Sequence, residues 1–323
     1  MQKLGTREEE ELVKEIETYC NIARANGSFL SMDDLLQLTA VDASEAEVEE
    51  ALRASPQLRS NLVFSSGYII GKPDDPESQQ VEKAIQEQVE SKRRAISNLT
   101  AANDFARLLG DRASLVAVGG TSSYLSAGAK DDIDLFCITK RDAMWIFMLE
   151  SLVKARVYGA MRKVTPQLCF SFIMDEGWAE REFRKPQDAI FARDVLTSKV
   201  VRGIGVYNAA LRSAPWMDSF FPRLYRMRIE STLLKEPGHD GGTADRSRVG
   251  SSASNPWRKV VNSFLCATLG SYILLKAWLL NRRFAKEGRI EPIFTTDIGA
   301  DHCVYESNKY KKIRRMYSPL HAR

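Results

Sequence analysis

Residues 120–134, with the sequence GTSSYLSAGAKDDID, join a turn rich in glycine and hydroxyl groups to two aspartates that stand two positions apart. Before the turn, residues 114–118 form the apolar run SLVAV, which predicts a short buried strand. After it, residues 132–138 read DIDLFCI and predict a second strand. Because side chains alternate between the two faces of a strand, we expect Asp132 and Asp134 to share one face.

The turn has the composition of a phosphate-binding corner. Gly119 and Gly120 let an anion approach the main chain closely, and Thr121 and Ser122 can cap a short helix that follows. A strand that leads into a helix start leaves backbone N–H groups free and presents the positive end of the helix dipole. We therefore expect a triphosphate to bind at this turn, with Lys130 as an additional cation.

The two aspartates predict a site for a divalent cation. Like charges about 4 Å apart repel by about 1 kcal/mol in water and by about 4 kcal/mol at an effective dielectric near 20. A divalent cation removes that cost, and oxygen ligands from a carboxylate pair suit Mg²⁺, which keeps water and phosphate in its other positions. A lone Asp-x-Asp is more often a solvated strand end. The glycine turn one strand upstream is what favours the metal interpretation.

Together these residues resemble the signature of the DNA polymerase β nucleotidyltransferase superfamily, and most closely its minimal nucleotidyltransferase branch. Gly120-Thr121 stands at the Gly-Ser position of that signature, and Asp132 and Asp134 stand at its metal-binding carboxylates. Further similarity is found in DDIDLFCIT at residues 131–139 and in the Ala-Arg-Asp run at residues 192–194. The similarity covers most of the chain from about Glu8 to Arg228.

The resemblance implies an α+β fold. This is a small mixed β-sheet nucleotidyltransferase core flanked by helices, with an N-terminal winged-helix-like domain and C-terminal helices. It also implies transfer of a nucleoside monophosphate from a nucleoside triphosphate to an acceptor, with release of pyrophosphate. The acceptor class stays open between a small molecule, a protein and an RNA end.

The resemblance also assigns roles to individual residues. Asp132 and Asp134 would be the catalytic carboxylates and would hold one or two Mg²⁺ ions, for which Mn²⁺ could substitute. The nucleotide phosphates would be bound by four residues of the turn and one lysine: Gly119, Gly120, Thr121, Ser122 and Lys130.

Active members of the superfamily usually carry a third carboxylate on a neighbouring strand. The corresponding strand here, residues 167–174, contains no acid, so Asp175 and Glu176 just past its end are the candidates. An acid at the end of a strand is more often simply solvated. Two alternatives to an active enzyme therefore remain open. One is a catalytically weakened nucleotide-binding or sensor protein, and the other is a winged-helix regulator with a vestigial enzyme domain.

The chain is expected to divide into five segments. Residues 1–72 are predicted to hold three helices and a hairpin, a combination that resembles a winged-helix domain. The other segments are a linker with a long connecting helix, the nucleotidyltransferase core, a flexible loop, and a C-terminal helical segment with a basic tail: residues 73–109, 110–230, 231–255 and 256–323.

The distribution of charge favours an anionic substrate and disfavours duplex DNA. Residues 1–100 contain 11 Lys and Arg against 19 Asp and Glu, whereas the rest contains 35 against 23. The predicted catalytic part is thus the basic part, which suits polyphosphate or nucleic-acid substrates. The predicted third helix of the first segment is acidic, and DNA affinity depends mostly on cationic contacts to phosphates. We therefore expect this segment to make packing or protein contacts.

The sequence favours a cytoplasmic protein without membrane contact. The five cysteines show no Cys-x-x-Cys spacing, and residues 1–11 lack the pattern of a signal peptide. The weakly charged run at residues 260–280 contains polar side chains and is expected to be a buried helix rather than a membrane span. The basic tail KYKKIRRMY is expected to be a solvated helix face, with contact to RNA or phosphate as the alternative. The histidines are expected to be exposed: His239, His302 and His321.

Overall fold

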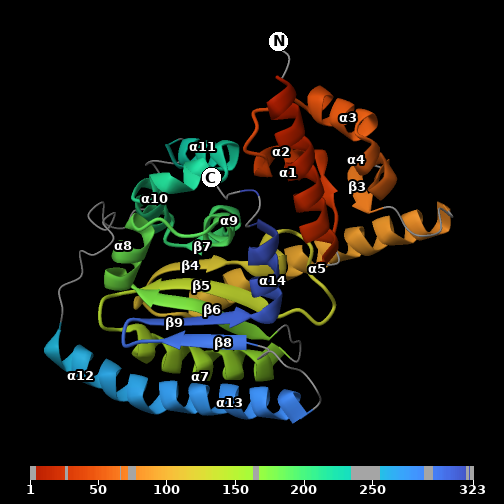
Figure 1. Ribbon diagram of the computed structural model, residues 1–323. Helices are drawn as coiled ribbons and strands as arrows, with labels where there is room; N and C mark the ends of the chain where they lie inside the picture. Colours follow the sequence, from red (N-terminus) through yellow and green to blue (C-terminus); the bar gives the residue numbers. More distant parts are fainter. Residues whose placement is uncertain are drawn as a thin grey trace.

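The computed structural model describes residues 5–25, 28–65, 67–71, 78–162, 167–233, 255–286, 294–317 and 320. In this part of the chain, helices pack on both faces of a six-stranded sheet, and a smaller N-terminal unit stands against them (Figure 1). The fold is therefore mixed α+β, with a small mixed sheet and flanking helices, as the sequence predicts. The expected linker at residues 73–76 and most of the expected loop at residues 231–255 lie outside the described residues.

The strands of the central sheet follow the order β7-β4-β5-β6-β9-β8. β5 and β6 run parallel, and the other neighbouring pairs run antiparallel. Leu115 and Ala117 of β4 enter one buried cluster, and Val116 and Val118 enter the other. Both faces are covered, which is why these strands are continuous apolar runs in the sequence. The bounds are β4 Ala113–Val118, β5 Ile133–Thr139, β6 Leu168–Asp175, β7 Lys199–Arg202, β8 Phe294–Ile298 and β9 His302–Ser307.

Two layers of helices cover the sheet, and each layer shares one buried cluster with it. The first layer contains α8 Glu176–Arg184, α9 Ala189–Thr197, α10 Ile204–Arg212, the 3₁₀ turn η1 Pro215–Ser219 and α11 Pro222–Leu233. The second layer contains α5 Ser78–Leu108, α7 Met144–Arg162, α12 Pro256–Leu265, the π-helical turn η2 Cys266–Gly270 and α13 Ser271–Lys286. The predicted long connecting helix is α5.

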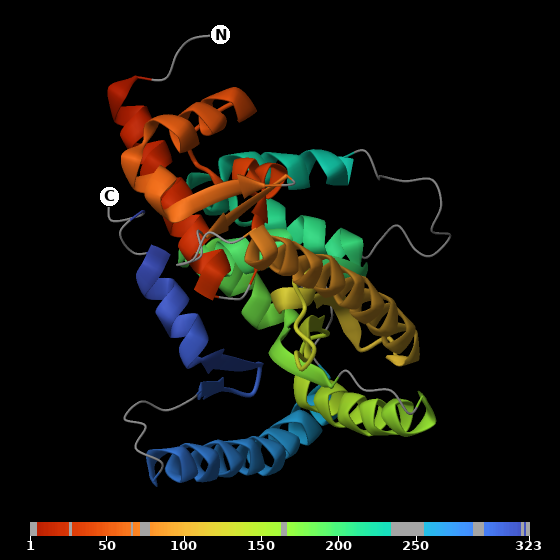
Figure 2. The same ribbon diagram turned by 90° about the vertical axis from the view of Figure 1, so that its right-hand side faces the viewer.

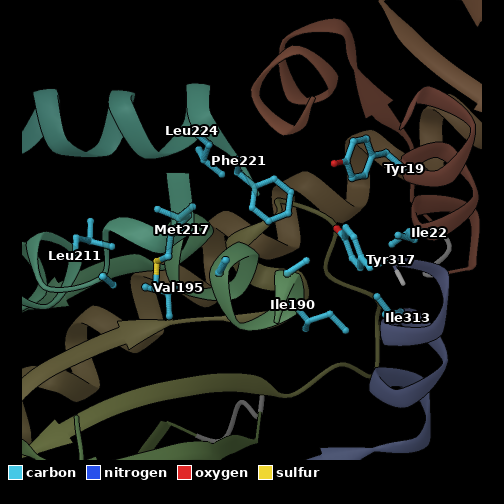
Figure 3. Packing of buried hydrophobic residues seen from close by; sticks show 14 of the residues in the cluster. Tyr19, Ile22, Ile190, Val195, Leu211, Met217, Phe221, Leu224, Ile313 and Tyr317 are labelled. Atoms are coloured by element: carbon cyan, nitrogen blue, oxygen red, sulfur yellow. The ribbon is translucent and has the colours of Figure 1, made fainter. Parts of the chain in front are cut away.

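The N-terminal unit packs directly on the first layer. Tyr19 of this unit lies 6.5 Å from Phe221 and 5.9 Å from Tyr317 between ring centroids (Figure 3). Ser31 and Ser44 form capping boxes that fix the starts of two of its helices. The hairpin expected near residues 63–70 is present. The elements are α1 Thr6–Ala25, β1 Leu30–Ser31, α2 Met32–Leu38, α3 Glu45–Ala54, α4 Pro56–Asn61, β2 Leu62–Ser65 and β3 Tyr68–Gly71.

The end of the chain differs from the expected helices and solvated tail. β8 and β9 join the central sheet, where β9 pairs with β6. The basic tail does form a helix, α14 Asn308–Tyr317, but its Ile313 and Tyr317 are buried in the cluster that contains Tyr19 (Figure 3). The local basic composition conceals this packing, because the partners of these residues are far away in the sequence.

Residues 256–286 form one continuous helical segment, but the expectation that it is buried is wrong. It is the one stretch among the described residues that is long and apolar enough to cross a membrane, and only 11% of its most apolar window is buried. Its buried positions are Asn262, Gly270 and Ala277, on the side that faces the protein. The segment runs along the lower edge of the molecule in Figure 1. Sequence composition does not distinguish a fully buried apolar helix from one that is covered on one side.

We expect Gly203→Ala to destabilise the protein strongly. Gly203 precedes α10 with φ +84°, and a Cβ there would overlap the carbonyl oxygen of Ser114 and lie 2.9 Å from Leu115 Cα. Left-handed strain and this overlap should lower the free energy of unfolding by at least about 2 kcal/mol. The control is Gly205→Ala, whose Cβ meets no atom within 4 Å and which should change it by less than about 1 kcal/mol. Chemical denaturation that finds both variants equally stable would contradict the close approach of Gly203 to β4.

Candidate functional site

The glycine turn lies directly on the second aspartate. Gly119 and Gly120 connect β4 to the short helix α6 Gly120–Ser123, and the Gly119 N–H donates to the Asp134 carbonyl oxygen at 2.9 Å. Gly120 has φ +59°, and a Cβ at this position would overlap the Asp134 carboxylate. Glycine at position 120 therefore lets the backbone lie against this carboxylate without displacing it.

Asp132 and Asp134 line the same cavity, as the alternation of the strand predicts. Burial, followed by the charges of Asp132 and Asp194, raises the pKa of the half-buried Asp134 carboxyl group to about 6, against a hydrogen bond from Ser171 that lowers it. Partial burial and the charge of Asp131 also raise the pKa of Asp132, which lies nearer the rim. Both carboxyl groups are therefore held in surroundings that disfavour their negative charge.

Two carboxylates in such surroundings fit a divalent cation. Mg²⁺ prefers oxygen ligands and commonly takes one or two carboxylates together with waters and substrate phosphates. Within the described ranges, no three His, Cys, Asp or Glu side chains come together as a ready-made metal site. The described part of the chain thus supplies a carboxylate pair, and phosphate and water oxygens would have to complete the coordination.

The other predicted phosphate-binding residues have different roles. Thr121 lines the cavity, but its hydroxyl donates to Asp131 at 2.8 Å. Ser122 is buried and accepts a hydrogen bond from Asn98 Nδ2 at 3.0 Å, which fixes α6 to α5. Lys130 is exposed in the turn before β5 and does not line the cavity. Of the predicted site residues, those of the glycine turn and the aspartate pair therefore lie together at the cavity, whereas Ser122 and Lys130 do not line it.

Neither candidate for a third carboxylate lies near the aspartate pair. Asp175 stands opposite Thr139 in the β5–β6 register. That is five residues beyond Asp134, or about 16 Å at a strand rise of about 3.3 Å per residue. Asp175 caps the start of α8, and Glu176 accepts from Ser114 Oγ at 2.5 Å. Both acids hold local structure away from the pair, so neither is placed to complete the site. Both are also buried, which differs from the solvated strand end that is more common for such acids.

A hydroxyl and a thiol occupy the part of β6 that faces Asp134. Ser171 forms a side-chain hydrogen bond with the Asp134 carboxylate. Cys169 is opposite Asp134 in the register, and its side chain also forms a hydrogen bond with the Asp134 carboxylate. Burial, followed by the charge of Asp134, raises the pKa of the Cys169 thiol to about 12. Both groups are neutral near pH 7, so β6 adds no third negative charge beside the pair.

The sequence did not reveal the role of Asp194, an aspartate of α9 that lines the cavity. The negative charge of Asp194 helps to raise the pKa of Asp134. The Asp194 carboxylate accepts hydrogen bonds from Tyr124 Oη at 2.6 Å, from Tyr310 Oη, and from Arg193 Nη2 at 3.0 Å. The Ala-Arg-Asp run at residues 192–194 was the available signal, but it does not indicate these partners. Asp194 thereby joins the residue after α6 to α9 and α14.

α14 forms part of the cavity wall. Its Arg314 Nε donates to Asp188, the cap of α9, at 2.5 Å, and its Tyr310 and Tyr317 line the cavity. The Arg193 guanidinium lies 4.9 Å from the centroid of the Tyr124 ring. Polar and aromatic contacts thus dock this helix beside the glycine turn.

One of the histidines also differs from expectation. His302 lies in β9 and its side chain is 16% exposed. Its ring stacks on Trp178 with centroids 5.1 Å apart, and Nδ1 lies 2.9 Å from Asp301 Oδ1. The expectation of an exposed His302 is therefore wrong, whereas His239 and His321 lie outside the described residues.

The cavity has a volume of about 1340 Å³ and extends from the glycine turn to α14 and α13. Small-molecule pockets usually measure about 300–1,000 Å³, so this cavity is larger than most of them. Five basic residues line it: Arg193, Lys199, Arg228, Lys276 and Arg314. Lys199 pairs with Val118 just before the glycine turn, and burial followed by the charge of Arg228 lowers the pKa of Lys199. Positive charge therefore does reach the cavity, from residues other than Lys130.

Comparisons with family models, curated proteins and solved structures found no match to this chain. The site geometry and the sequence resemblance are therefore the basis for a functional proposal.

We expect Asp134→Asn to stabilise the protein at pH 8 in metal-free buffer. The folded-state pKa of Asp134 is raised from 3.8 to about 6, so folding disfavours the carboxylate and wild type carries this cost above pH 6. Allowing for partial exposure, the gain in unfolding free energy should be about 1–2 kcal/mol. It should shrink as the pH falls from 6 towards 4, because the folded wild type then binds a proton.

The control for this measurement is Asp33→Asn, a change of an exposed carboxylate in the first turn of α2 that should leave the protein no more stable. Denaturant unfolding at both pH values makes the comparison. A variant less stable than wild type at pH 8 would show that the Asp134 charge is well compensated in the folded protein.

Proposed function

We propose that this protein is a Mg²⁺-dependent nucleotidyltransferase that transfers a nucleoside monophosphate from a nucleoside triphosphate to an acceptor and releases pyrophosphate. The observation that supports this most is the seating of the Gly120 backbone on the Asp134 carboxylate, with Asp132 in the same cavity. A backbone turn that could bind phosphate and a carboxylate pair that could bind a metal therefore line the same cavity. The acceptor remains a small molecule, a protein or an RNA end.

The protein groups would act mainly by positioning and by balancing charge. Asp132 and Asp134 would hold the metal, which when bound supplies charge neutralisation at the triphosphate. The turn at Gly119 and Gly120 would orient the phosphates, and Lys199 with Arg228 would add positive charge. Holding the phosphate close to an acceptor in a fixed geometry is the main source of rate in such transfers.

A catalytically weakened nucleotide-binding or sensor protein is the second candidate. Ser171 and Cys169 face Asp134 from β6, and Asp175 is occupied as a helix cap. No carboxylate of β6 is therefore placed to take the proton of an acceptor hydroxyl. This observation favours nucleotide binding over turnover.

We also infer that the N-terminal unit is winged-helix-like and that the protein works in the cytoplasm. Helices followed by the β2–β3 hairpin support the first inference. α3 carries glutamates in its first turn, and Tyr19 of α1 is buried against the catalytic unit. A packing or protein-contact role therefore fits this unit better than duplex DNA binding or a regulator with a vestigial enzyme domain.

We expect a nucleoside triphosphate with Mg²⁺ to raise the melting temperature of the wild type, and Asp132→Ala/Asp134→Ala to abolish the shift. A ligand at about 100 times its Kd stabilises a protein by about 2.7 kcal/mol, which is readily measured. ATP, CTP, GTP and UTP are compared, each with Mg²⁺ and with EDTA. Asp33→Ala/Asp218→Ala removes two exposed aspartates that do not line the cavity and should keep the shift. A double site variant that responds like wild type would refute the site.

Transfer is tested separately, with labelled nucleoside triphosphates and pools of metabolites, protein and RNA. We expect the label to appear in one of the three pools and pyrophosphate to be released. Both results should require Asp132 and Asp134. If a nucleotide binds in a metal-dependent way but none of the four nucleoside triphosphates releases pyrophosphate, the result would instead support the nucleotide-binding or sensor protein. The two candidates therefore predict opposite results in one assay.

A further inference from the structure

The helical segment 256–286, made of α12, η2 and α13, leaves an apolar face uncovered along its length. Large side chains on this face are 52–77% exposed: Trp257, Val260, Phe264, Tyr272, Leu275 and Trp278. Within α12 and within α13 these side chains are three or four positions apart, so in each helix they fall on one side. Contiguous apolar surface of this extent marks an interaction site in soluble proteins.

The opposite face of the segment is fixed to the protein. Asn262 accepts from the Trp145 N–H at 2.7 Å and donates to the Ala300 carbonyl oxygen at 2.7 Å. A Cβ at Gly270 would lie only 3.3 Å from Ile298, so the backbone approaches β8 closely there. Lipid cannot surround a helix that is held in this way. The geometry therefore excludes a transmembrane placement of the folded protein and leaves the outer face free.

The charge of the segment identifies the partner. Residues 256–286 contain six Lys and Arg and no Asp or Glu. Arg282 lies 5.2 Å from the centroid of the Trp278 ring, so a cation and an aromatic group meet on the apolar face. Basic side chains beside exposed aromatic and aliphatic ones are typical of helices that lie in the headgroup region of a bilayer.

A second copy of this chain fits the face less well. Two such segments packed together would bring basic side chains near one another in either orientation, with no acidic residue in the segment to balance them. An anionic bilayer supplies both the negative charge and the apolar medium. α7 lies in the same layer, away from the N-terminal unit (Figure 2). Leu152, Val153 and Val157 of this helix are exposed as well.

We propose that segment 256–286 docks this protein onto an anionic membrane surface, with the helix axis parallel to the bilayer. The assignment does not depend on the proposed transferase activity. It replaces the expectation that the protein has no membrane contact. Tyr272 and Lys276 of the segment also line the cavity that contains Asp134, so docking brings the bilayer beside the site.

The test is cosedimentation of the full-length protein with vesicles. One set contains phosphatidylcholine alone, and in the other roughly a third of the lipid is phosphatidylserine. We expect binding to the anionic vesicles that is at least tenfold tighter than to the neutral ones and that weakens with salt. Each basic residue at such a surface contributes about a fivefold change, so Lys259→Glu/Arg282→Glu should lose at least tenfold.

Phe264→Ser/Leu275→Ser tests the apolar contribution and should also lose at least tenfold. Its control is Phe64→Ser/Met227→Ser, which removes side chains that are 47% and 44% exposed on β2 and α11 and should bind like wild type. Circular dichroism and melting temperature report whether each variant is folded.

Three outcomes overturn the proposal. The first is equal binding of wild type and the Phe264→Ser/Leu275→Ser variant to anionic vesicles, and the second is equal binding of wild type to both kinds of vesicle. The third is a wild-type protein that does not bind vesicles, and that forms by light scattering a dimer which this variant converts to monomer. That result assigns the face to a second copy of the chain.

Discussion

The negative charge of Asp134, held half-buried against a glycine backbone, is the constraint on which the site depends. A residue with a Cβ at position 120 would push this carboxylate from its place and would strain the backbone, which has φ +59° there. Burial and a neighbouring aspartate raise the pKa of Asp134, so the folded protein maintains a charge that its own interior disfavours. Such local instability is common where a protein is arranged for a ligand that it has yet to bind.

The rest of the fold holds this arrangement in place from several directions. β4 and β5 bring the turn and the aspartate together, and Ser122 fixes α6 to the long helix α5. From the other side, Asp194 joins Tyr124 to α14 through Tyr310. The Tyr19, Phe221 and Tyr317 rings then pack the N-terminal unit onto the same wall. The site is therefore enclosed by segments from both ends of the chain.

The sequence predicts what depends on near neighbours and misses what depends on distant ones. The strand, glycine turn and strand of residues 113–139 follow from local composition and alternation, and they are present. The positions of Asp194 and Lys199 follow from tertiary packing, and no local pattern reveals them. A register shift between Asp134 and Phe136 and the cap formed by Asp175 likewise decide which side chains of β6 face the pair. Composition alone also gave no sign of which face of segment 256–286 is covered.

The hydrogen bonds of Asp194 have a consequence for the order in which the protein is made. Tyr124 lies 70 residues before this aspartate and Tyr310 lies 116 residues after it. Contacts between such distant residues form late, because the intervening chain must first lose its freedom. During synthesis on the ribosome, Asp132 and Asp134 emerge well before α14, which forms part of the wall of their cavity. The wall of the cavity is therefore completed only after Tyr310 has left the ribosome, when both aspartates have long been in place in the chain.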